Sequence, residues 1–152
     1  MIQGKVVVAG EARGESLVSD EPLSFWGGYD QITGEIIDRR HPLSGQNGAG
    51  RVLALPASRG SSTTTAVLLE AVRRGTAPAA IVTTCVDHFF ALASIVADEI
   101  YGRPFPVVAI SDAEFATLRN GQQIEIDLSG ILLIAELKEA ASQCRNPVDV
   151  RR

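Results

Sequence analysis

A run of hydroxyl side chains lies between an apolar segment and a helical pattern, in the stretch LPASRGSSTTTAVLLEAVRRG that covers Leu55–Gly75. Ser58, Ser61 and Ser62 are followed there by three threonines, with no lysine, histidine or cysteine among them. The stretch therefore offers no ready-made base, nucleophile or metal ligand. It can instead bind an anion, because the first turn of a helix presents unpaired N–H groups and a partial positive charge to a carboxylate, a phosphate or an alkoxide.

Two neighbouring residues fit an anion site. Arg59 can clamp a carboxylate or phosphate with two hydrogen bonds, and Gly60 allows a close approach of the backbone or a left-handed turn. A plain helix N-cap is the alternative, since serine is among the preferred capping residues. One serine would serve for that, whereas several hydroxyl residues lower helix propensity. Both interpretations stay open at this level, but the phosphate-binding G-x-x-x-x-G-K-[ST] pattern is absent.

Strand and helix patterns alternate around this stretch. We expect strands at residues 51–57, 79–84 and 105–110 and around Gly130, and helices at residues 61–75, 87–102 and 111–121. Such alternation favours an α/β fold with parallel pairing, in which ligands bind where the strands end. The strand-rich residues 5–19 and the last strands suggest a second sheet packed nearby. A further strand is expected near residues 34–37, followed by a long loop at residues 38–50.

Size and charge bound the possible functions. The 152 residues, 45% of them hydrophobic, predict one domain at residues 1–138 and a loosely ordered tail at residues 139–152. The net charge of −4 argues against a nucleic-acid platform. Neither a leader nor a membrane-spanning run is recognisable, so we expect a cytoplasmic protein with no membrane contact. Two cysteines and two histidines without close spacing make no zinc site.

Several other polar residues carry two interpretations each. His41 either contacts a substrate or partner from its loop or is a surface histidine. His88 is expected at the start of a helix, and Asp87 either caps that helix or approaches the site from the neighbouring strand end.

The cysteines and the exposed loop residues are interpreted more simply. We expect Cys85 to be a buried cysteine at a strand end. A disulfide with Cys144 is allowed by number but disfavoured in the cytosol. Trp26 is either an interface anchor or a lid over the core, whereas Asp20 and Glu21 are expected in a solvated loop.

Three motifs together resemble the small subunit, or swivel domain, of the aconitase X family. They are VSDEPLSFWGG, D-x-R-H-P-L and P-x-S-R-G-S-S-T, within a resemblance that runs from about Gly10 to about Ala135. The resemblance implies a mobile, swivelling β/β/α domain in which the first serine of a G-S-S loop, here Ser61, is the catalytic general base. The arginine that usually follows the two serines is replaced by Thr63. We predict substrate binding by Arg59, Gly60, Ser62, Thr63 and His41.

The same resemblance implies half of a hydro-lyase. A large catalytic subunit would hold an iron ion or iron–sulfur cluster and most substrate contacts, and this chain would bind no metal or cofactor itself. Two hydroxy acids are substrates in the family, cis-3-hydroxy-L-proline and mevalonate 5-phosphate. We prefer the first, because residues 51–82 resemble bacterial members and no extra basic cluster for a phosphate is evident. A phosphohistidine carrier using His88 and a stand-alone anion-binding module remain as alternatives from other classes.

Overall fold

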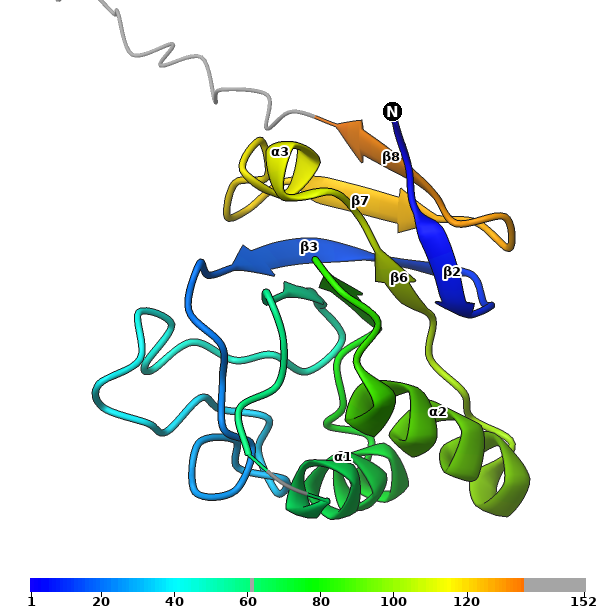
Figure 1. Cartoon of the computed structure of the whole chain (residues 1–152). Coiled ribbons are helices and arrows are strands. Elements are labelled where there is room, and N and C mark those ends of the chain that lie inside the picture. The colour runs from blue at the N-terminus through cyan, green and yellow to red at the C-terminus, as the bar shows by residue number, and fades with distance from the viewer. Residues whose placement is uncertain (61, 136–152) are drawn as a thin grey trace, which may run out of the picture.

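Alternating strands and helices form one structural unit, which we describe from a computed structural model over residues 1–60 and 62–135 (Figure 1). The described strands are β1 (Ile2–Gln3), β2 (Lys5–Val8), β3 (Ala12–Val18), β4 (Val52–Ala54), β5 (Ala80–Thr83), β6 (Val107–Ala109), β7 (Gln123–Ile126) and β8 (Ile131–Ala135). The described helices are α1 (Thr63–Arg74), α2 (His88–Tyr101) and α3 (Asp112–Phe115). The expected boundary between domain and tail at residues 138 and 139 lies outside the described residues.

Four neighbouring strands pair in parallel, as the alternating pattern predicts. β3 pairs with β4, β4 with β5 and β5 with β6. The sequence of β4 is a continuous apolar run because both faces of this strand are buried. Val52 and Ala54 enter one hydrophobic core, while Leu53 and Leu55 enter the other, as expected from side chains that alternate across a strand.

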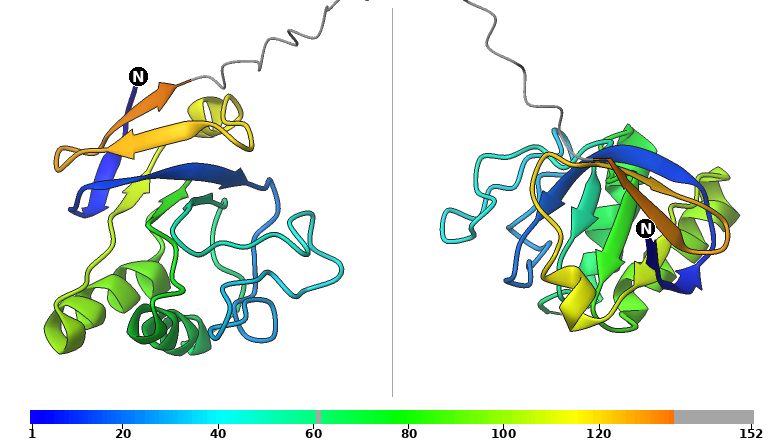
Figure 2. Two further views of the ribbon diagram at one scale, coloured as in Figure 1. Left: turned by 180° about the vertical axis from the view of Figure 1, so that it is seen from behind. Right: turned by 90° about the horizontal axis from the view of Figure 1, so that it is seen from above.

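The sheet is nearly closed on itself (Figures 1 and 2). Its strand order is β1-β8-β7-β3-β4-β5-β6-β2, and Gly4 alone separates β1 from β2. The strand-rich start and end of the chain form an antiparallel section, β1-β8-β7-β3, as expected, but this section is continuous with the parallel strands, since β3 pairs with β4 as well as with β7. Gly4 permits the closure. Its N–H donates to Gly130 O at 2.9 Å, and a Cβ added there would overlap with Val108 Cγ1.

The two long helices lie side by side under the parallel strands, on the side opposite β7, β8 and α3 (Figure 1). The core between these helices and the sheet also takes in apolar side chains of residues 19–50. Phe25 packs edge-on against Phe90 of α2, with ring centroids 5.5 Å apart. The connection from β3 to β4 is thus long and irregular but anchored in the core.

Two local expectations need correction. Residues 34–37 form no strand; Ile36 and Glu35 make only isolated bridges to Tyr29 and Asn47. Gly34, with φ of +81°, turns the chain there, so Ile36 is buried as part of the loop. The expected helix at 111–121 covers only Asp112–Phe115, which begins with a capping box between Ser111 and Glu114.

Candidate active site

The hydroxyl loop, which we define as residues 55–62, connects the end of β4 to the start of α1. It lies at the carboxyl end of the parallel strands, where ligands bind in such folds. Arg59, Gly60 and Ser62 are exposed. Gly60 has φ of +118°, and a Cβ there would meet only Ser24 Oγ, at 3.8 Å, so glycine is required by the backbone and not by crowding. Ser61 lies outside the described residues.

The start of α1 lacks the plain serine cap that the sequence allows at Ser62. Ser62 occupies the N-cap position with helical φ and ψ of −53° and −15°, and its side chain makes no capping hydrogen bond. The first turn also carries no acidic side chain. The positive end of α1 is therefore not neutralised by a carboxylate of its own first turn.

α2 begins with a cap that also reaches the hydroxyl loop. Asp87 Oδ1 accepts hydrogen bonds from the N–H groups of Phe89 and Phe90, at 3.0 and 3.2 Å. Its other oxygen, Oδ2, accepts from Ser58 N at 2.8 Å and from Ser58 Oγ at 2.7 Å. The predicted cap of α2 by Asp87 is confirmed, and its second oxygen contacts the hydroxyl loop.

Further hydrogen bonds hold the loop on two sides. Pro56 O accepts from Thr84 N at 3.2 Å and from Thr84 Oγ1 at 3.3 Å, on the β5 side. On the other side Arg59 N donates to Leu23 O at 3.0 Å. The helices are tied as well, since Thr65 Oγ1 donates to Phe89 O at 3.1 Å. The backbone before residue 61 is therefore fixed between two separate segments.

Cys85 is exposed, so the expectation of a buried cysteine is wrong. Its thiol lies against the loop, with Sγ 3.7 Å from Pro56 O. Partial shielding from solvent and then the negative charges of Asp87 and Asp112 raise the pKa of this thiol above its usual value. A thiol that resists ionisation is a weak nucleophile and metal ligand. Its possible pairing with Cys144 falls outside the described residues.

No three His, Cys, Asp or Glu side chains gather as a metal-binding group within residues 1–60 and 62–135. An iron ion or iron–sulfur cluster needs several such ligands. The described side chains therefore do not fit either group. Cys85 stands without the companions that a cluster would need.

His41 is buried and not on the surface, with 6% of the residue exposed. Its Nδ1 accepts from Leu43 N at 3.1 Å, and its Nε2 lies 3.2 Å from Glu21 O. An imidazole that accepts at Nδ1 carries its proton at Nε2, so Nε2 donates to Glu21. Both ring nitrogens are then used within the chain. No described contact joins His41 to the hydroxyl loop.

The remaining singled-out residues are placed largely as the sequence indicates. His88 is the first residue of α2 and is exposed. Asp20 and Glu21 are exposed in the loop after β3. Trp26 is 72% exposed, so it is no lid over the core. None of the described helices is long and apolar enough to span a membrane.

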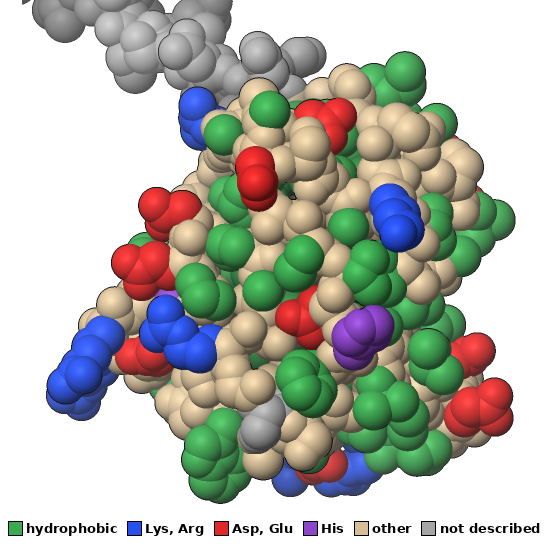
Figure 3. Space-filling view, in the orientation of Figure 1, with side chains coloured by type: hydrophobic (Ala, Val, Ile, Leu, Met, Phe, Trp, Pro, Cys, Tyr) green, Lys and Arg blue, Asp and Glu red, His purple; other side chains and the backbone are tan. Residues whose placement is uncertain are grey.

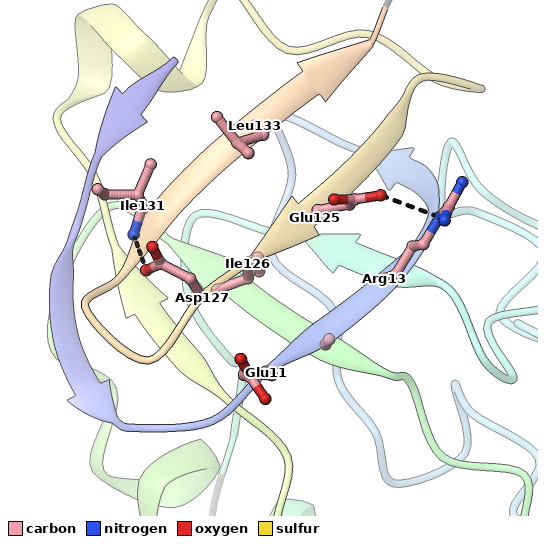
Figure 4. Close-up of a pocket in the computed structure, with 8 residues that line it drawn as sticks. Glu11, Arg13, Glu125, Ile126, Asp127, Ile131 and Leu133 are labelled. Carbon is pink, nitrogen blue, oxygen red and sulfur yellow. Dashed lines mark hydrogen bonds and ion pairs between the residues drawn. The ribbon is translucent and has the colours of Figure 1, made fainter.

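A hollow of about 480 Å³ lies elsewhere, over β3, β7 and β8 (Figure 4). It contains three carboxylates, and Arg13 is paired with Glu125 at 3.2 Å. Hydrogen bonds from the backbone N–H of Ile131 and from Ser129 lower the pKa of Asp127. The hollow is therefore negatively charged and unsuited to an anionic substrate, and none of the predicted site residues lines it.

Comparisons with known proteins agree with this arrangement. The family described as the aconitase X swivel domain matches residues 1–134. Crystallised aconitase X from Thermococcus kodakaraensis superposes with a TM-score of 0.79 at 32% identity, covering 89% of this chain and 98% of that one. The expected α/β fold of the aconitase X swivel domain is thereby confirmed.

Curated relatives are of two lengths. The cis-3-hydroxy-L-proline dehydratase of Pseudomonas aeruginosa is 47% identical over 74% of this chain, and that of Hypocrea jecorina is 36% identical over 91%. This chain spans only 19% and 23% of their lengths. The phosphomevalonate dehydratase small subunit of Methanothermobacter thermautotrophicus is 36% identical over 81% of this chain and 90% of its own. By sequence and by fold, the chain belongs to the aconitase X swivel domain family.

Proposed function

We propose that this chain is the smaller component of a two-part hydro-lyase that removes water from a small hydroxy acid. Its relatives support this, since the same domain occurs as a fifth of two longer dehydratases and as nearly all of a dehydratase small subunit. The partner we expect is a larger polypeptide equivalent to the remainder of the longer relatives. No nucleic acid or membrane takes part, and the reaction takes place in the cytoplasm.

We assign the general base to Ser61. The observation that carries this assignment is the hydroxyl loop itself, which follows the carboxyl end of β4 and leads directly into the N-terminus of α1. Its neighbours Gly60 and Ser62 are exposed. An alkoxide at this position would be stabilised by the positive end of the helix, and it could remove the proton next to the substrate carboxylate.

The flanking residues have binding roles in this proposal. The exposed Arg59 forms no ion pair with any described residue, so its guanidinium is suited to the substrate carboxylate. The hydroxyl of Ser62 makes no capping hydrogen bond to α1, so it can donate to the same carboxylate. Gly60 and Thr63 complete the contact surface. We do not assign His41 a direct contact with the substrate, because both of its ring nitrogens are already hydrogen-bonded within the chain.

Cis-3-hydroxy-L-proline is the substrate that we favour. Of the two relatives with this activity in their names, that of Pseudomonas aeruginosa is 47% identical and that of Hypocrea jecorina 36%, against 32% to 39% for the phosphomevalonate dehydratase small subunits compared. Arg59 is also the only Lys or Arg in residues 55–72. One cation suits a single carboxylate, whereas a phosphate usually recruits more positive charge. Mevalonate 5-phosphate remains the second candidate.

We place the iron ion or iron–sulfur cluster of the family on the larger partner. Such a group would act as a Lewis acid on the departing hydroxyl. The described residues of this chain do not fit it, so the chemistry that we assign here is limited to the base, the helix N-terminus and the anion contacts.

The test is dehydration by this chain purified with its larger partner. Ser61→Ala should lower kcat by about 10²–10⁴-fold, the usual contribution of a general base, while the complex still assembles. Ser129→Ala, in the turn between β7 and β8, is the matched serine control and should keep normal kcat. Both candidate substrates are assayed, and loss of water is followed by the product's absorbance.

The same assay separates the alternatives. A phosphohistidine carrier predicts that His88→Ala abolishes function and that the chain accepts a phosphoryl group. A hydro-lyase component predicts that His88→Ala retains activity. Near-normal turnover by Ser61→Ala would remove Ser61 from the mechanism.

A further inference from the structure

We propose that Asp87 is a positioning residue, which fixes the hydroxyl loop and thereby places Ser61 for proton removal. The proposal rests on the function proposed above and concerns the clamp between Asp87 and Ser58. We define this clamp as the two hydrogen bonds from Ser58 N and Ser58 Oγ to Asp87 Oδ2, at 2.8 and 2.7 Å.

Asp87 is well placed to hold the loop rigidly. The residue is only 8% exposed, and each of its carboxylate oxygens accepts two hydrogen bonds. Hydrogen bonds to a charged, shielded acceptor are stronger than those between neutral groups. The other oxygen of Asp87 is bound to the first turn of α2. The position of the hydroxyl loop is therefore fixed relative to a helix and not relative to another loop.

The clamp acts close to the proposed base. Ser58 lies three residues before Ser61, and the next residue, Arg59, is held on the opposite side through its N–H bond to Leu23 O. A parallel bridge between Leu23 and Ser58 completes this arrangement. The chain leaves the clamped residues through Gly60, whose surroundings are open, so the backbone direction at Gly60 depends on where Ser58 is fixed.

Asp87 itself is not the group that removes the substrate proton in this proposal. Each of its two oxygens already accepts two hydrogen bonds from other groups of the chain. Its effect on the reaction would therefore pass through the loop. Displacement of a reacting group by about 1 Å can cost about 10²-fold in rate, so loss of the clamp should lower kcat more than it raises KM.

Two variants separate the clamp from the helix cap. Asp87→Ser retains a good N-cap for α2 but its short hydroxyl cannot hold both Ser58 donors. Ser58→Ala removes one half of the clamp and leaves the cap of α2 intact. In the complex with the larger partner, we expect Asp87→Ser to lower kcat by about 10²-fold and Ser58→Ala to lower it less, with KM close to that of the wild type in both.

Two further variants complete the experiment: a double variant of the clamp, and a control variant that removes a helix cap far from the hydroxyl loop. Asp87→Ser combined with Ser58→Ala should lower kcat no further than Asp87→Ser alone, because both remove the same interaction. Ser111→Ala removes the cap of α3 and should lower Tm without changing kcat. Wild-type kcat in Asp87→Ser, or additive losses in the double variant, would overturn the proposal.

A second readout keeps the clamp distinguishable from the proposed function. If the wild-type complex dehydrates neither substrate, the function fails, and amide hydrogen exchange of the isolated full chain decides the clamp. Faster exchange at residues 58–62 in Asp87→Ser and Ser58→Ala, but not in Ser111→Ala, would support it. Unchanged exchange would refute it.

Discussion

At the scale of single residues, His41 shows how a polar side chain in a long loop can be structural. Its imidazole bridges Glu21 O and Leu43 N, which lie 22 residues apart within the irregular connection between β3 and β4. Tyr29 also connects distant parts of the backbone, since its buried hydroxyl donates to Thr76 O at 2.6 Å. Burial raises the pKa of Tyr29 well above its ordinary value and keeps this hydroxyl protonated as a donor.

We predict that His41→Ala lowers the free energy of unfolding by about 1–3 kcal/mol, because two polar backbone groups lose their partner. For a chain of this size that corresponds to a fall in Tm of about 2–4 °C for each kcal/mol. Calorimetry measures the stability, and kcat and KM of the complex should stay near wild type. Tyr29→Phe is the matched control, and it should likewise lower the Tm and leave kcat and KM near those of the wild type. A raised KM with unchanged Tm would instead return His41 to the substrate.

At the scale of elements, α1 is stabilised at its C-terminal end by charge. Glu70 Oε1 lies 2.6 Å from Arg73 Nη2 and 2.7 Å from Arg74 Nε, and both arginines are in the last turn, where cations favour the helix dipole. Hydrogen bonds from the two arginines lower the pKa of Glu70 from 4.5 to about 2. All three side chains are partly exposed, so the contribution to stability is modest and is screened by salt.

The pH dependence follows from that shift. A carboxyl with a lowered folded-state pKa stabilises the protein above its unfolded pKa and loses the effect as pH falls through the folded value. We predict that Glu70→Gln has a slightly lower Tm than wild type at pH 7 and that the difference disappears between about pH 4.5 and pH 2. Glu99→Gln on α2, which is in no ion pair with a described residue, is the control. A difference that grows on acidification would contradict the assignment.

At the scale of the whole molecule, the outer face of α2 has several exposed apolar side chains and also carries the exposed Glu99. Phe90, Ala93 and Ala97 turn the inner face of α2 into the core, whereas Leu92, Ile95 and Ile100 are 48%, 51% and 62% exposed. Hydrophobic side chains gather over α2 in the space-filling view (Figure 3). The N-terminus of α2 carries Asp87, so this face begins beside the hydroxyl loop that the proposed partner has to cover.

We predict that Leu92→Glu and Ile95→Glu each weaken binding of the larger partner by about 10–100-fold, since burial of such a side chain contributes about 1.5–3 kcal/mol. The isolated chain should keep its Tm, because both residues are exposed. Binding is measured by titration calorimetry or by gel filtration of the mixed components. Leu133→Glu, 51% exposed on β8, is the control, and a larger loss with this variant than with Leu92→Glu would contradict the placement.

The sequence by itself determined the order of the elements, the hydroxyl loop before α1 and the family. Periodicity, capping residues and stop signals such as Gly75 act over a few neighbouring residues, so they can be recognised along the chain. The same locality explains the errors, because Glu35 and Ile36 look like a strand but lie in a loop that Gly34 turns.

Only the tertiary structure decided how distant residues meet. Ser58 and Asp87 are 29 residues apart, and Gly4 meets Gly130 across the closure of the sheet. The fold likewise decided that His41 is buried and that the hydroxyl of Ser62 makes no capping hydrogen bond to α1. Such contacts depend on how whole elements pack, and no local pattern specifies which of several possible partners a carboxylate or an imidazole finally reaches.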